Sequence, residues 1–114
     1  MRDREIADYL HDILDSINEI RDFTEGMSFG DFSADKKTVN AVLRSIEVMG
    51  EAARKIPEGI RSQYAQVPWR KMTGMRDKLI HEYHGVDIDT VWQTLHEDIP
   101  PLQDQIQEII DKES

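Results

Sequence analysis

Residues 39–56 read VNAVLRSIEVMGEAARKI, and their apolar side chains recur at spacings of three and four residues. This period places one continuous apolar stripe on one face of an α-helix, and the stripe consists of Val39, Val42, Leu43, Ile46, Met49, Ala53 and Ile56. The preceding GMSFGDFSAD is rich in turn formers, and Ser33 is the expected N-cap because its hydroxyl can accept an unpaired amide proton. Pro57 is expected to close the helix at about Lys55.

Three further long segments show the helical period. Residues 3–24 carry an apolar stripe that Gly26 can end, made of Ile6, Leu10, Ile13, Leu14, Ile17 and Ile20. A third helix is predicted from Trp69, just after Pro68, to about His84, with Gly85 as the C-terminal turn. The fourth is capped by Asp87 or Asp89 and extends to Ile110, with a kink or break at Pro100–Pro101 because proline has no amide proton.

These segments predict an all-α fold. Sustained strand alternation is absent from the 114-residue sequence, and a short helix is expected in PEGIRSQYA. The predicted architecture is an up-down helical bundle of four main helices plus one short helix in a single domain, residues 1–114. A domain of this size is only marginally stable alone, which favours a partner subunit.

The composition limits location and chemistry. The chain has no cysteine, which excludes disulfides and thiolate metal sites. The first residues, MRDREIADYLHD, are charged throughout, and no later stretch approaches the roughly 18 apolar residues of a membrane span. We therefore expect a cytoplasmic protein with no membrane partner.

The net charge of −9 argues against a partner as acidic as nucleic acid. The charge is unevenly distributed, however. Residues 36–78 contain ten Lys or Arg and four acidic residues, for a net charge of +6, so the rest of the chain sums to −15. This asymmetry indicates either a solvated charged face or a local basic surface on an acidic protein.

Arg76 is the residue that least fits an ordinary helix. At 100° per residue it falls in the middle of the apolar stripe formed by Trp69, Met72, Leu79, Ile80 and Tyr83. A guanidinium there needs an acidic partner, a phosphate or a second subunit, because burying an unpaired charge is costly. One interpretation is an arginine at the edge of the core, paired to an acid such as Glu47 or Glu51.

Asp77 and His81 are four residues apart, a spacing that lets a carboxylate fix the tautomer of an imidazole on the same helix. The alternative is an exposed ion pair. His81, Glu82 and His84 resemble a metal site only weakly, because no further ligands are evident. Taken by itself, Tyr83 is an ordinary aromatic residue at a helix end.

The segment RDKLIHEY, residues 76–83, matches the pattern R-x4-H-x-Y, and Asp77 fits the polar residue favoured after the arginine. Together with the GEA of residues 50–52, the PW of residues 68–69 and the later IPPL, this segment resembles the HepT-type toxins of the HEPN superfamily. The similarity covers nearly the whole chain.

The resemblance implies a homodimer, or a higher oligomer in complex, in which two motifs meet in one cleft and cut RNA without a metal or other cofactor. Arg76 and His81 would be catalytic, with Asp77 and Tyr83 in support. The family's partner is a minimal nucleotidyltransferase antitoxin that attaches AMP to the motif tyrosine, here Tyr83. On an ideal helix Arg76 and His81 point about 140° apart, which favours a site shared between two protomers.

Two functions remain open from the sequence. The first is a metal-independent endoribonuclease toxin, which the intact motif favours. The second is a non-catalytic helical interaction module that binds a nucleotidyltransferase partner or a nucleotide, which the net acidity favours.

Overall fold

The computed structural model describes residues 5–81 and 85–113, and of His81 it describes the backbone alone. The described residues form seven helices and one pair of two-residue strands, which confirms the predicted all-α class. The elements are α1 (Ile6–Thr24), α2 (Phe29–Ala34), α3 (Lys36–Arg54), α4 (Glu58–Gln63), α5 (Trp69–Leu79), β1 (Ile80–His81), β2 (Gly85–Val86), α6 (Ile88–Glu97) and α7 (Ile99–Glu113).

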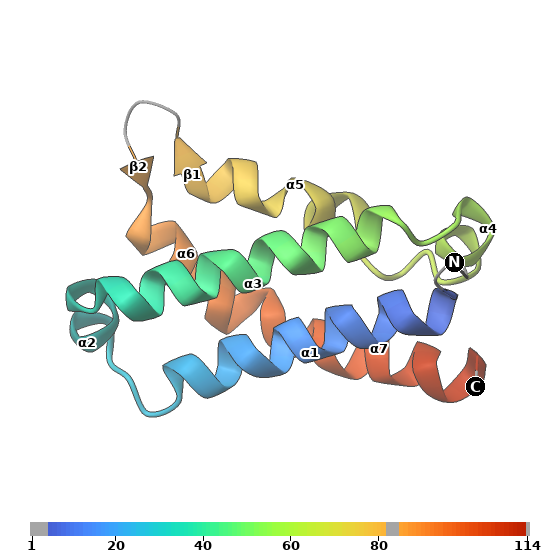
Figure 1. Ribbon diagram of the computed structural model, residues 1–114, viewed down its shortest axis with the longest axis horizontal. Coiled ribbons are helices and arrows are strands. Elements are labelled where there is room, and N and C mark those ends of the chain that lie inside the picture. Colours follow the sequence, from blue (N-terminus) through green and yellow to red (C-terminus); the bar gives the residue numbers. More distant parts are fainter. Residues whose placement is uncertain (1–4, 82–84, 114) are drawn as a thin grey trace.

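The long helices run alternately up and down (Figure 1). Helix α3 lies between α1 and α5, while α7 packs against α1 and α6 packs against α5. The start of α1 and the end of α7 lie at one end of the bundle, and the β1–β2 pair lies at the other. The four predicted long segments correspond to α1, α3, α5 and the α6–α7 pair, and the predicted short helix corresponds to α4.

The predicted apolar stripes form the core. All seven stripe residues of residues 39–56 are buried, and in α1 the four residues Leu10, Ile13, Ile17 and Ile20 are at most 1% exposed. Ile6 and Leu14 pack against this core from its edge. Among the described helices, none is both long enough and apolar enough to cross a bilayer.

The connection before α3 differs from the prediction. It contains the short helix α2, whose Phe32 is fully buried and packs against Trp92 with ring centroids 5.3 Å apart. The predicted N-cap Ser33 therefore lies inside α2. The N-cap of α3 is Asp35, whose carboxylate accepts hydrogen bonds from the Thr38 amide at 3.1 Å and the Thr38 hydroxyl at 2.8 Å.

The third predicted helix is five residues too long, because α5 ends at Leu79 rather than at His84. The Leu79 carbonyl oxygen, which a continuing helix would bond to residue 83, instead accepts from the Asp87 amide at 2.9 Å. Strand β1 pairs antiparallel with β2, with Ile80 opposite Val86 and His81 opposite Gly85. Gly85 has a φ of +76°, which favours glycine, but it belongs to β2 rather than to a helix end.

The break in the fourth helix is confirmed. Helix α6 begins after Asp87, whose carboxylate caps the Thr90 amide at 3.2 Å, and ends at Glu97. Helix α7 starts at Ile99. Pro100 and Pro101 thus occupy the first turn of α7, where an amide proton would have no partner within the helix.

Helices α3 and α5 are in close backbone contact at Gly50. A Cβ atom added to this buried glycine would lie 3.1 Å from the carbonyl oxygen of Met72, which is backbone and cannot rotate away. The absence of a side chain at position 50 therefore sets the distance between the two helices.

We predict that Gly50→Leu destabilises the protein by about 2 kcal/mol or more, because the added side chain must push α5 away from α3. The check is the free energy of unfolding from urea titration at one fixed protein concentration. Gly74→Ala in α5 is the matched control. A Cβ at Gly74 meets no atom within 4 Å, so this change should stabilise the helix by about 0.5–1 kcal/mol. Equal stability of Gly50→Leu and wild type would contradict the close approach.

Candidate functional site

Helix α5 carries Arg76 and is fixed at both ends. At its start, Trp69 is buried and its indole nitrogen donates a hydrogen bond to the carbonyl oxygen of Tyr64 at 3.1 Å. Lys71 donates to Asp98, between α6 and α7, at 2.8 Å. At its end, the chain turns directly into β1. The position of Arg76 is therefore set by contacts at both ends of the helix.

Arg76 lies at the edge of the buried face rather than in its middle. The buried residues of α5 are Trp69, Met72, Met75 and Leu79. The predicted stripe omitted Met75 and included Ile80 and Tyr83, which follow the end of the helix. With Met75 included, the centre of the buried face lies roughly 45° from Arg76 at 100° per residue, and the Arg76 side chain is 50% exposed.

Arg76 is paired with Glu47, one of the two acids that the interpretation as an arginine at the edge of the core named. Its Nε donates to Glu47 Oε1 at 2.9 Å, which joins α5 to α3. The other oxygen of Glu47 lies 3.5 Å from a terminal nitrogen of Arg44. Glu51, the other acid considered, instead lies 3.6 Å from Arg54 on its own helix. Glu47 thus bridges two guanidinium groups.

Asp77 does not share a helix with His81, so the predicted helical pairing of these two residues is wrong in its premise. Helix α5 ends at Leu79, between them. The Asp77 side chain is 86% exposed, and its Oδ1 lies 3.7 Å from a terminal nitrogen of Arg76. The angle of about 140° between Arg76 and His81 also fails to apply, because it assumes an unbroken helix.

The described residues include only part of the R-x4-H-x-Y motif. The backbone of His81 lies in β1, two residues beyond the end of α5 and opposite Gly85. The His81 side chain and the residues Glu82, Tyr83 and His84 lie outside the described part of the chain. Within the described part, no group of three or more acidic or histidine side chains is arranged to hold a metal ion.

A hollow of about 360 Å³ lies beside Arg76, between α3 and α5. Glu47 and Arg76 line it, as do Gly50 and Met72, which are in close contact across the two helices. Thr73 also lines the hollow, and its hydroxyl donates to the carbonyl oxygen of Arg70 at 3.0 Å. The arrangement gives a half-exposed guanidinium at the rim of a polar recess.

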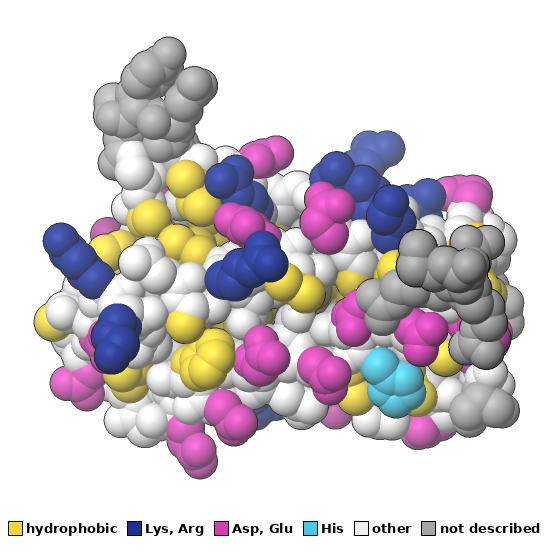
Figure 2. All heavy atoms as spheres, in the orientation of Figure 1, with side chains coloured by type: hydrophobic (Ala, Val, Ile, Leu, Met, Phe, Trp, Pro, Cys, Tyr) yellow, Lys and Arg dark blue, Asp and Glu magenta, His cyan; other side chains and the backbone are white. Residues whose placement is uncertain are grey.

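The surface charge is asymmetric in the way that the sequence indicated. In Figure 2 the Lys and Arg side chains gather over α3, α4 and α5 with some Asp and Glu side chains among them, whereas Asp and Glu side chains dominate the edge formed by α1. Because counter-ions screen surface charges beyond about 10 Å, the basic side acts locally despite the net charge of −9.

The shifted pKa values belong to groups that secure the fold. Hydrogen bonds from the Thr38 hydroxyl and amide lower the pKa of Asp35 at the start of α3. A hydrogen bond of 2.7 Å to Glu113 raises the pKa of Tyr64, because the phenol must keep its proton to donate it. Asp35 caps α3, and the bond from Tyr64 to Glu113 joins the end of α4 to the end of α7.

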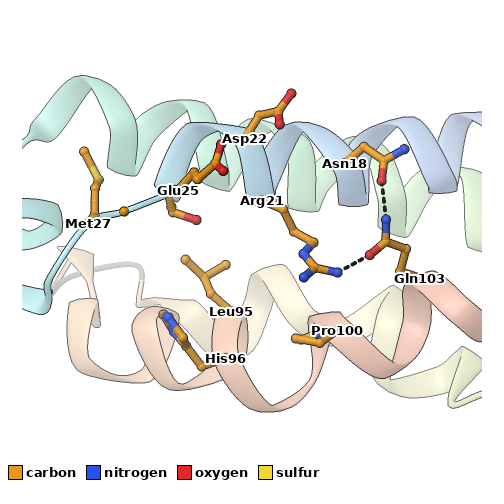
Figure 3. Close-up of a pocket in the computed structure, with 11 residues that line it drawn as sticks. Asn18, Arg21, Asp22, Glu25, Met27, Leu95, His96, Pro100 and Gln103 are labelled. Atoms are coloured by element: carbon orange, nitrogen blue, oxygen red, sulfur yellow. Dashed lines mark hydrogen bonds between the residues drawn. The ribbon is translucent and has the colours of Figure 1, made fainter.

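A larger hollow lies elsewhere, between the C-terminal half of α1 and the α6–α7 junction (Figure 3), with a volume of about 860 Å³. Arg21 reaches across it to donate to Gln103, and Gln103 donates in turn to Asn18 at 2.7 Å. Asp22 and Glu25 also line it, so charges of both signs are present. It contains none of the predicted site residues.

Sequence reasoning missed two contributors to the geometry around Arg76. Met75 lies three residues after Met72 and four before Leu79, so the helical period was a sufficient signal for its burial. Gly50 was noted as part of a motif, but only the contact with Met72 shows why a glycine stands there.

A family model and several related proteins all indicate the same family for this chain. The model of the "Ribonuclease HepT-like" family matches residues 13–109. The chain is 45% identical over 106 residues to a protein of Thermococcus cleftensis named "Probable ribonuclease HepT", covering 93% of this chain and 96% of that one. It is 43% identical over 110 residues to a "Putative RNase" of Methanocaldococcus jannaschii, covering 96% and 91%.

A third relative, a "Putative RNase" of Caldanaerobacter subterraneus subsp. tengcongensis, is 42% identical over 105 residues, covering 92% of this chain and 94% of that one. No solved structure matches the chain. The family model spans most of the sequence, including Arg76 and His81, and the relatives match nearly end to end. The chain therefore belongs to the HepT-like ribonuclease family.

Proposed function

We propose that this protein is a metal-independent endoribonuclease, and that it is the toxin of a HEPN and minimal-nucleotidyltransferase toxin–antitoxin system. The observation that carries the proposal is the placement of Arg76. It is a half-exposed guanidinium on the basic side of the bundle, and the chain passes from its helix directly into the strand that holds His81. Membership of a ribonuclease family supports the same conclusion.

RNA cleavage by these residues is chemically complete without a metal. A base removes the proton of the 2′-hydroxyl, the 2′ oxygen attacks the adjacent phosphorus, and an acid protonates the departing 5′ oxygen. The products are a 2′,3′-cyclic phosphate and a free 5′-hydroxyl. Arg76 stabilises the negative charge that builds on the phosphate, and His81 transfers protons.

The functional unit is a homodimer with a composite cleft. One protomer supplies one His81, whereas the reaction needs a base and an acid at the same time, so the second imidazole comes from the second copy. A two-fold axis would bring two identical motifs together in this way. The angle between Arg76 and His81 on an ideal helix does not bear on the dimer, because α5 ends at Leu79.

The first test is cleavage of a defined RNA in EDTA. Wild type should cut it and leave cyclic phosphate ends, whereas His81→Ala should lower kcat/KM by about 10² or more. Arg76→Ala should lower it by about 10² because a charge-stabilising donor is lost. Lys78→Ala, which removes an exposed cation two residues away, is the matched control and should change kcat/KM by less than about fivefold.

An all-DNA oligonucleotide of the same sequence should stay intact, because it lacks the 2′-hydroxyl. Cleavage that is absent in wild type, or equal in wild type and both variants, would contradict the enzyme proposal. It would favour the alternative of a non-catalytic module that binds a nucleotidyltransferase or a nucleotide. The net charge of −9 and the pairing of Arg76 with Glu47 are the observations that favour that alternative.

The composite cleft is tested by a heterodimer with one wild-type and one His81→Ala protomer, purified through two different affinity tags. If each cleft needs both imidazoles, this heterodimer should have less than about a tenth of the wild-type rate. If each protomer acts alone, it should keep roughly half of that rate. The second result would be consistent with the ribonuclease proposal but would contradict the composite cleft.

Tyr83 is proposed as the site to which the partner nucleotidyltransferase attaches AMP. The modification adds bulk and negative charge to the motif itself, in the proposed cleft, and thereby opposes RNA binding. Coexpression with a nucleotidyltransferase encoded next to this gene should increase the intact mass by one AMP group and abolish cleavage in EDTA. Tyr83→Phe should show neither change, and an unchanged mass of the wild-type protein would count against modification.

A further inference from the structure

We propose that Glu47 is a positioning residue for the reaction, and that it holds the Arg76 guanidinium in the orientation in which it meets the RNA phosphate. The inference rests on the proposed ribonuclease function and adds a residue outside the R-x4-H-x-Y motif. It is built from the one described contact that joins Arg76 to another helix.

The contact uses the side nitrogen of the guanidinium. Arg76 Nε lies 2.9 Å from Glu47 Oε1, the distance of a charge-assisted hydrogen bond. The guanidinium is planar with five donor protons, so a bond at Nε fixes the plane and leaves the terminal nitrogens on the other edges of the group. A phosphate is then met by a preoriented donor pair rather than by a freely rotating side chain.

Glu47 is itself held in place, which a positioning residue requires. It lies in the middle of α3, its side chain is 33% exposed, and its second oxygen is 3.5 Å from Arg44. Gly50, one turn further along α3, keeps the two helix backbones in close approach. The carboxylate therefore acts from a rigid element across a fixed distance.

No other described acid takes the same part. Asp77 approaches a terminal nitrogen of Arg76 only to 3.7 Å and is 86% exposed, so its attraction is screened by water. Glu51 is 66% exposed and pairs with Arg54 on α3. Among the described residues, Glu47 alone combines hydrogen-bond distance with partial burial at Arg76.

This role separates binding from turnover. Removing the carboxylate takes one negative charge away from Arg76 and Arg44, so attraction of the RNA should stay equal or rise. The same change frees the guanidinium to sample unproductive rotamers, so the chemical step should slow. If Glu47 only stabilised the fold, its removal would weaken RNA binding and turnover together. If Glu47 instead competed with the RNA phosphate for Arg76, its removal would raise kcat.

The experiment compares Glu47→Ala with Glu51→Ala on the full-length protein, using a defined RNA in EDTA. Both remove one carboxylate from α3, one turn apart, and alanine favours the helix at both positions. Glu47→Ala should lower kcat about tenfold or more with KM unchanged or lower. Glu51→Ala should leave kcat within about twofold. Glu47→Gln, which keeps an acceptor oxygen, should recover part of kcat.

A second readout does not depend on activity. The Nε–H signal of Arg76 in ¹⁵N NMR, assigned by its loss in Arg76→Lys, should be protected from exchange in wild type and in Glu51→Ala. It should exchange rapidly in Glu47→Ala. The kinetic measurement tests whether Glu47 affects turnover, and the NMR measurement tests whether Glu47 holds Arg76.

Wild type that fails to cleave RNA would overturn the proposed function and with it the catalytic role of Glu47, while the NMR signal would still decide whether Glu47 holds Arg76. Wild type that cleaves would leave the ribonuclease standing. In that case an unchanged or raised kcat in Glu47→Ala, or an equal loss in Glu51→Ala, would overturn the inference alone.

Discussion

The close approach of α3 and α5 at Gly50 is the constraint on which the candidate site depends. With no side chain at position 50, the backbone of α3 comes so near that an added Cβ would lie 3.1 Å from the Met72 carbonyl oxygen. Arg76 lies four residues after Met72 and Glu47 three residues before Gly50, so the same approach brings their side chains to 2.9 Å. A larger residue at position 50 would lengthen this contact as well as loosen the core.

The helices and the core were predictable from the sequence because burial follows a period that the sequence shows directly. The stripe of residues 39–56 is buried at every predicted position, and the break before Pro100 follows from a missing amide proton. The acid that pairs with Arg76 was narrowed to two candidates one turn apart. Only the rotation of α3 against α5 distinguishes Glu47 from Glu51, and no local pattern encodes that rotation.

The end of α5 was not predictable from the sequence. The contacts that replace the helix there join residues before position 82 to residues after position 84. RDKLIHEYH keeps a helical pattern, so local preference continues the helix. The tertiary structure instead bonds Leu79 to Asp87, pairs Ile80 with Val86 and uses Asp87 to cap α6. Leu79 and Ile80 thus contact residues eight and six positions further along the chain instead of continuing the helix. This exchange moves His81 out of the register of Arg76.

In an acidic protein that acts on RNA, the positions of the Lys and Arg side chains matter more than their total number. Long-range repulsion from a charge of −9 is screened within about 10 Å, so the approach of RNA is governed by the local side formed by α3, α4 and α5. On that side Glu47 lowers the local positive charge yet gives Arg76 a fixed direction. Attraction depends on the sum of charges, whereas catalysis depends on the orientation of a few of them. A carboxylate beside the proposed catalytic cation is therefore compatible with a nuclease. It weakens the attraction of RNA but fixes the orientation of the Arg76 guanidinium.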